Sequence, residues 1–301
     1  MKNISLFIVI FLFTPLTLWA GMKEAEEAFS SGEYEKAMSE FTKLADDGNA
    51  DAMYNLAVMY RHGAGNKDGE PDEKTAFEWY KKAAESGHAR SQFLLGLMYG
   101  SGTEFLKKNL AKSIEWLKKS ADHHNADAEF SLGVAYEQGV GVKKNSQESL
   151  KYYKRSAEHG NVTGQFVIAV KYKNEGNIAE AFKWYESAAK AGHIGAMNDL
   201  AGMYVRGEGV KQDTKEGIKL YEETLKEGNW VAAFNLGAIY KNGIGIKANK
   251  KEAYKWYAIA LKKGYKAVEG EMLPLEKEMK KGDINAALKE ADNWLLKNFK
   301  Y

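Results

Sequence analysis

Apolar residues recur at spacings of three and four along most of the chain, which predicts amphipathic helices rather than strands. One motif, Leu-Gly-x-x-Tyr with its Leu-Ala and Ile-Ala variants, returns with a period of about 36 residues. Its tyrosines are Tyr60, Tyr99, Tyr136, Tyr172, Tyr204 and Tyr240. A fixed period of this length predicts tandem helical units that stack on one another.

A second aromatic series follows each of these tyrosines 12 to 19 residues later, and a small pair such as Ala83-Ala84 comes after it. The series is Trp79-Tyr80, Trp116-Leu117, Tyr152-Tyr153, Trp184-Tyr185, Leu220-Tyr221 and Trp256-Tyr257. Each unit is therefore predicted to hold a helix A with the first motif and a helix B with the second. A glycine that suits the left-handed helix end closes most units, but His124 takes its place in repeat two.

Pairs of glycines lie between the predicted A and B helices. They are Gly63 and Gly65, Gly139 and Gly141, Gly207 and Gly209, and Gly243 and Gly245. A phosphate-binding loop would need a preceding strand and a longer glycine pattern or a Gly-Lys-Ser/Thr ending, and neither occurs. We interpret the pairs as structural turns, in which the following Val142, Val210 or Ile246 packs back into the core.

These motifs together resemble the Sel-1-like repeat (SLR) family, which is related to the tetratricopeptide repeats. The resemblance covers about residues 50 to 265 and implies an all-α fold, an α/α right-handed superhelical solenoid with a concave inner face. We assign residues 49–265 to six Sel-1-like repeats and residues 21–48 to a tetratricopeptide-like N-terminal repeat. Repeat four is short, and its turn over residues 174–181 is similar to a tetratricopeptide turn.

Residues 266–301 depart from the repeat and are predicted to form a C-terminal helical cap. Pro274 ends the regular pattern, and Asp283 is predicted to cap a final helix. One face of this helix is apolar and the opposite face is polar, which is what the exposed end of a solenoid requires. The apolar face carries Ile284, Leu288, Ala291, Leu295 and Phe299, and the polar face carries Lys289, Glu290, Asn293 and Lys297.

Residues 1–20 are predicted to be a secretory signal peptide. A weakly basic start precedes an apolar run over residues 4–13, Pro15 follows, and Ala20 is a small residue suited to cleavage. The run is shorter than the roughly 20 residues that span a bilayer, so no stable membrane anchor is expected after cleavage. The predicted location is periplasmic or secreted.

Composition and motifs argue against several classes of function. A net charge of +2 gives no strong attraction for nucleic acid, and the absence of cysteine excludes disulfides and thiolate chemistry. Four of the six histidines, His88, His123, His159 and His193, keep to the repeat period, which indicates packing or helix capping. No catalytic or metal-binding motif is visible, so we predict a protein that is not an enzyme and that needs no cofactor or metal.

The concave face is the predicted binding surface. In the related tetratricopeptide arrangement, positions 2, 5, 9, 12 and 13 of helix A line this face. Position 5 carries Tyr54, Phe93, Phe130, Phe166, Asn198 and Phe234. These rings either hold a partner or pack between repeats, as apolar residues at helical spacing usually do. Positions 12 and 13 vary more between repeats and include Arg61, Glu137, Lys173, Arg206 and Lys241.

We therefore predict a scaffold or adaptor of the cell envelope that binds a partner protein or peptide through its concave face. Two alternatives remain open at this point. The first is an immunity protein that neutralises a secreted toxin, because some members of the family with signal peptides do so. The second is a hydrolase that acts on cell-wall material or β-lactams, although the branch of the family linked to β-lactams is rich in cysteine.

Overall fold

The computed structural model describes residues 15–66 and 69–299. Within these ranges every regular element is helical and no strand occurs, which confirms the predicted all-α class. The chain divides into an N-terminal unit, residues 1–152, and a C-terminal unit, residues 153–301. None of the helices in the described part of the chain is both long and apolar enough to cross a membrane.

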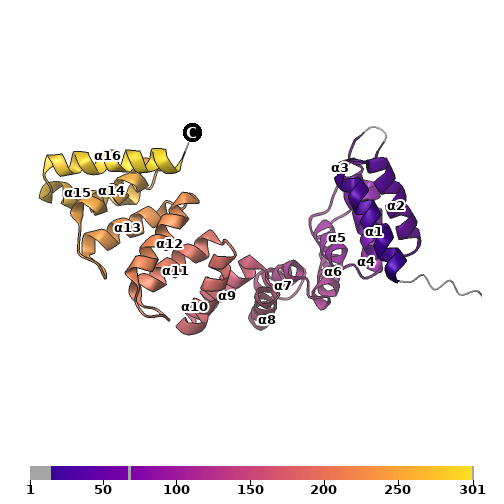
Figure 1. Cartoon of the computed structure of the whole chain (residues 1–301). Helices are drawn as coiled ribbons and strands as arrows, with labels where there is room; N and C mark the ends of the chain where they lie inside the picture. Colours follow the sequence, from indigo (N-terminus) through magenta and orange to yellow (C-terminus); the bar gives the residue numbers. More distant parts are fainter. Residues whose placement is uncertain (1–14, 67–68, 300–301) are drawn as a thin grey trace, which may run out of the picture. The chain divides into compact units, whose positions relative to one another are not determined.

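Helices of the N-terminal unit pack in order along the chain (Figure 1). From α1 to α7, each helix A contacts the helix B that follows it, as α3 contacts α4, and each helix B contacts the next helix A, as α4 contacts α5. The helices are α1 (Pro15–Ser30), α2 (Tyr34–Asp46), α3 (Ala50–His62), α4 (Glu73–Glu85), α5 (Ala89–Ser101), α6 (Leu110–Asp122) and α7 (Ala126–Gln138), and α8 (Ser146–Glu158) crosses the boundary between the units.

The C-terminal unit repeats this paired packing and then ends differently. Its regular helices are α9 (Val162–Asn174), α10 (Ile178–Lys190), α11 (Ile194–Arg206), α12 (Thr214–Lys226), α13 (Val231–Asn242) and α14 (Lys250–Lys262). They are followed by the 3-10 helix η1 (Lys266–Val268), α15 (Glu269–Glu278) and α16 (Lys281–Asn298). The long helix α16 packs against α14, which departs from the order of the repeats.

Helix A begins in five units with a side chain that caps the first turn. Asn49, Asn125 and Asn161 accept a hydrogen bond from the backbone N–H three residues later. His88 and His193 take the same place and accept through Nδ1, from Ser91 and Ala196 respectively, each at 3.1 Å. These contacts satisfy N–H groups that the helix itself leaves unpaired. The predicted structural role of these two histidines is confirmed.

The glycine pairs form structural turns, as the sequence predicts. The first glycine of each pair ends helix A in the left-handed conformation, as Gly207 does with φ of 68°. The second lies against helix B of the preceding repeat. A Cβ on Gly209 would be 2.8 Å from the carbonyl oxygen of Ile178, the first residue of α10. Val142 and Ile246, which follow two of these pairs, pack against buried clusters of their units.

His124 occupies the position that glycine holds at the end of other units. Its φ is 59°, the only positive φ of a non-glycine residue in the described ranges. The equivalent glycines have a φ near 90°, for example 90° at Gly87 and 92° at Gly160. Residues with a Cβ disfavour this region, so repeat two carries local backbone strain that the other units avoid.

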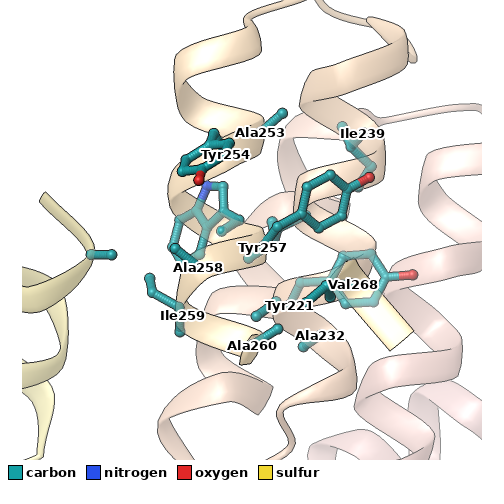
Figure 2. Packing of buried hydrophobic residues seen from close by; sticks show 14 of the residues in the cluster. Tyr221, Ala232, Ile239, Ala253, Tyr254, Tyr257, Ala258, Ile259, Ala260 and Val268 are labelled. Atoms are coloured by element: carbon teal, nitrogen blue, oxygen red, sulfur yellow. The ribbon is translucent and has the colours of Figure 1, made fainter. Parts of the chain in front are cut away.

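Aromatic and small residues share the core of the C-terminal unit (Figure 2). Tyr257 and Trp256 of α14 are buried, with exposed fractions of 0% and 2%. Ala232 and Ala260 lie near Tyr221 in the same cluster and are also buried, because only small residues leave room for neighbouring helices to approach. The core is thus built between repeats, and each unit depends on its neighbours.

The C-terminal cap agrees with its predicted faces but not with its predicted start. Ala287 and Ala291 are buried against α14, while Leu296 is 64% exposed. Asp283 is not the cap of the last helix, because α16 already begins at Lys281 and its N-cap is Lys280. Asp283 lies in the first turn, where its carboxylate interacts favourably with the positive helix end. Pro274 lies inside α15 and does not end a helix.

The apolar core of the predicted signal peptide, residues 4–13, lies outside the described residues. Helix α1 begins at Pro15 and continues through Ala20, the predicted cleavage point. Helices α1 and α2 pack together and occupy the place of the predicted tetratricopeptide-like unit.

Candidate partner-binding surface

The position-5 side chains are half-buried at the junctions between successive repeats. Three of their rings share one arrangement, in which the ring contacts the helix-B tyrosine of its own unit and the N-cap residue of the next helix. The sets are Tyr54 with Tyr80 and His88, Phe166 with Tyr185 and His193, and Phe234 with Tyr257 and Tyr265. The ring of Phe166 is stacked on His193 with centroids 4.3 Å apart.

The other position-5 residues fit this pattern less closely. Phe93 packs against the buried cluster around Leu117 and Leu132, and Phe130 is also half-buried. Asn198 breaks the aromatic series, and its side-chain oxygen accepts a long hydrogen bond of 3.5 Å from Asn235. The rings thus contribute to packing between repeats while keeping part of their surface exposed. Whether that surface holds a partner stays a prediction.

The cations at position 12 lie beside the helix-B tyrosines. Arg61 is exposed and hydrogen-bonds the hydroxyl of Tyr80. Burial raises the pKa of Tyr80, and the guanidinium of Arg61 opposes that rise. Lys173 lies over the ring of Tyr185, with its Nζ 5.8 Å from the centroid.

Lys241 is also at position 12 of its helix A, but it forms an ion pair with the C-terminal cap. Its Nζ lies 2.7 Å from Oε2 of Glu271 in α15, and both side chains are partly exposed. Glu271 also raises the pKa of Tyr257, after the larger effect of burial. The cap therefore supplies a carboxylate at the point where another repeat would follow.

Arg206, at position 13, forms a bidentate pair with Glu208 of the following turn. Its Nε and Nη2 lie 2.6 and 2.9 Å from the two carboxylate oxygens. This hydrogen bonding raises the pKa of Arg206 and lowers the pKa of Glu208, so both stay charged. Burial raises the pKa of the adjacent Tyr221 to about 12. Glu137 lies exposed at the end of α7.

Asp199 is a further member of this surface that the sequence motifs do not indicate. It is half-buried at position 6 of α11 and hydrogen-bonds Tyr185 of the preceding helix B. Burial first and Asp199 second raise the pKa of Tyr185. Because Lys173 lies over the same tyrosine ring, three polar groups from α9, α10 and α11 meet at one place. An acidic residue at position 6 of helix A can be seen in the sequence. Only the packing of α10 against α11 shows that this residue, Asp199, faces Tyr185.

The arrangement recurs with different side chains. In three of the six repeats, a basic residue near the end of helix A, a tyrosine of helix B and a residue of the next helix form one set. The sets are Arg61 with Tyr80 and Leu94, Lys173 with Tyr185 and Asp199, and Lys241 with Tyr257 and Glu271. We call the surface formed by helix-A positions 2, 5, 9, 12 and 13, with these tyrosines, the helix-A face. The helix-B tyrosine is present in five of the six repeats, with Leu117 in its place in repeat two, and the other members of the set vary.

This fold is a helical-repeat solenoid, and comparison with known proteins identifies the repeat. The Sel1 repeat model matches residues 50–88, 89–125, 126–161, 173–193, 194–229 and 230–265, which is more than half of the chain. The chain therefore belongs to the Sel1 repeat family, and the predicted resemblance is confirmed. The fourth match covers only the second half of its unit, where a short turn joins α9 directly to α10.

Two solved structures are similar over most of the chain. A Sel1 repeat protein from Oxalobacter formigenes is 34% identical, with a TM-score of 0.63, over 80% of this chain and 99% of that one. A protective antigen with an SLR fold, present in uropathogenic Escherichia coli strains, is 25% identical, with a TM-score of 0.71, over 93% of this chain and 61% of that one. Both likenesses support the solenoid.

Curated relatives match over a shorter stretch. Chitin synthase regulatory factor 1 of Schizosaccharomyces pombe is 37% identical over 93 residues, which cover 29% of this chain and 20% of that protein. The ERAD-associated E3 ubiquitin-protein ligase component HRD3A of Arabidopsis thaliana is 32% identical over 90 residues, covering 29% of this chain and 13% of that protein. The chain thus matches a fifth or less of each relative. Together the comparisons identify a Sel1-repeat helical scaffold, which is a protein-interaction fold.

Proposed function

We propose that this chain is a non-enzymatic adaptor of the cell envelope, which binds a partner protein or peptide through the helix-A face. The observation that carries the proposal is the set of a cation, a helix-B tyrosine and a residue of the next helix, which recurs in three repeats. A shared frame whose surface side chains vary from repeat to repeat is how solenoids present a specific surface. The apolar leader over residues 4–13 supports the envelope location.

The chemistry of the surface suits a polypeptide partner. Lys173 and Asp199 meet at Tyr185, so the same place offers a cation, a carboxylate and a hydroxyl. Such mixed polar groups beside half-buried rings resemble the composition of specific protein interfaces, where aromatic and arginine side chains dominate the binding energy. Relatives named as a regulatory factor and as a ligase component are consistent with an adaptor.

The test is affinity capture from the periplasmic fraction of the native host. The variant carries Arg61→Gln, Lys173→Gln, Arg206→Gln and Lys241→Gln together. The control carries Lys82→Gln, Lys119→Gln, Lys183→Gln and Lys219→Gln, which remove the same charge from exposed helix-B positions. We expect a partner enriched by the parent chain and by the control to be lost, at least tenfold, from the variant. Equal capture by all three chains, with equal helical melting curves, would contradict the proposal.

A further inference from the structure

Two pockets lie one repeat apart on the helix-A face of the N-terminal unit. The first, of about 210 Å³, lies among α3, α4 and α5 and is lined by Tyr80, Leu94, Leu97 and Met98. Among these lining residues the side chain of Leu97 is 43% exposed, while that of Tyr80 is only 3% exposed. The exposed leucine is apolar surface that the chain itself does not cover.

The second pocket, of about 300 Å³, lies among α1, α2 and α3. It is lined by Phe41, Asn55, Val58 and Met59, with Phe29 at its edge, 38% exposed. The residues that line it occupy the same repeat positions as residues that line the first pocket. The equivalent pairs are Phe41 and Tyr80 in helix B, and Asn55 and Leu94, Val58 and Leu97, and Met59 and Met98 in helix A. The repeat has therefore produced the same pocket twice.

Charge distinguishes the first pocket from the second. Arg61 lines it, where the second pocket has Phe29 at the equivalent position. Arg90, close by, donates from Nε to the Tyr54 hydroxyl at 3.1 Å. Within the described ranges neither arginine forms an ion pair, and Glu73, which also lines this pocket, lies beyond 4.0 Å of Arg61. Two guanidinium groups thus remain available to an acidic group at this end of the surface.

We propose that the two pockets receive two large apolar side chains of one partner segment, and that a carboxylate of the same segment binds Arg61. The inference rests on the proposed function and specifies which side chains the partner presents to this surface. Each pocket is at or below the lower limit of about 300 Å³ for small-molecule sites, so each suits one side chain rather than a cofactor. A polypeptide is the ligand that presents such groups at regular intervals, and apolar anchors at helical spacing are a recurring recognition mode.

The experiment selects random 12-residue peptides, displayed on phage, against the full chain. We expect enriched peptides to carry two large apolar residues with Asp or Glu beside one of them. One such synthetic peptide, labelled with fluorescein, is then titrated by anisotropy. Leu97→Asp and Val58→Asp should each weaken its binding at least tenfold, whereas Leu273→Asp, at a site 58% exposed in the C-terminal unit, should leave it unchanged. Helical melting curves check that all three variants fold.

A charge exchange tests the role of Arg61 directly. Arg61→Glu should weaken the peptide at least fivefold, and replacing the acidic residue of the peptide by Lys should restore binding to this variant. A merely structural arginine would not produce that rescue. Arg90→Gln shows whether the second guanidinium shares the carboxylate, and an effect larger than that of Arg61→Glu would overturn the assignment to Arg61.

Two outcomes would overturn the inference and leave the proposed function standing. Peptides that lack the apolar pair, or that bind Leu97→Asp as well as the parent, would place recognition elsewhere on the helix-A face. Sedimentation that shows a dimer of the full chain, lost in Leu97→Asp, would make a second copy the occupant. If the chain retained neither a peptide nor a periplasmic protein, that result would contradict both proposals.

Discussion

Gly237 in α13 faces the ring of Tyr257 in α14 so closely that a Cβ at Gly237 would lie 2.9 Å from the ring's Cζ. The ring's Cδ1 and Cε1 would be closer still. Tyr257 is fully buried, so its ring has little room to move aside. Gly96 and Leu117 stand in the same relationship in repeat two, with 2.9 Å between the added Cβ and Cγ. The glycine of the Leu-Gly-x-x-Tyr motif is therefore a site where helices A and B meet.

Gly237→Ala should lower the free energy of unfolding by about 1–3 kcal/mol, because overpacking a closed core costs that much. Helix propensity alone predicts the opposite sign, since alanine is favoured over glycine within a helix by about 1 kcal/mol. Gly270→Ala in α15 is the matched control, because a Cβ there meets nothing within 4 Å. Urea unfolding followed by circular dichroism should show opposite shifts of midpoint, and equal shifts would contradict the packing argument.

Acid should destabilise the chain through His88 and His193. Burial lowers the pKa of both from the ordinary value of 6.5, and each Nδ1 accepts a backbone hydrogen bond only when the ring is neutral. The unfolded state therefore binds protons more readily, so stability is present above pH 6.5 and falls as the pH drops towards the lowered folded-state values.

The double variant His88→Asn and His193→Asn should lose part of this pH dependence. Asparagine already serves as the cap at Asn49, Asn125 and Asn161, so the helix starts should be retained. Melting temperatures measured between pH 7.5 and 5 provide the comparison. The same slope in parent and variant would show that other groups govern the acid response.

His124→Gly should stabilise the chain by about 1 kcal/mol, because it removes a side chain from a left-handed backbone position. The reverse change, Gly87→His, places the same strain in the preceding unit and should destabilise by a similar amount. Thermal melting of both variants tests the pair. A destabilised His124→Gly would mean that contacts of the His124 side chain outweigh its backbone cost.

The cap should be sensitive on one face and tolerant on the other. Ala291→Asp buries a carboxylate against α14 and should cost about 3 kcal/mol or more, with association of the chain as the end becomes exposed. Leu296→Asp, at a position 64% exposed, should change stability by less than about 0.5 kcal/mol. Unfolding midpoints and light scattering distinguish the two, and equal effects would refute the assignment of the buried face.

Local signals account for the elements that the sequence predicts correctly. Caps, closing glycines and apolar spacing act within a few residues, and most units of the repeat carry each of these signals again. The assignment of Asp283 as a cap failed because several residues near Lys281 can begin a helix, and contact of α16 with α14 decides among them.

The sequence by itself determined the repeat, the helix pairs, the structural role of the glycines and the class of protein, because periodic motifs encode their own local geometry. Only the tertiary structure decided which side chains meet across repeats. It brought Asp199 to Tyr185, gave Lys241 a partner in Glu271, and formed the pocket between Arg61 and Leu97. Those relationships join residues of neighbouring units, and no spacing within one unit specifies them.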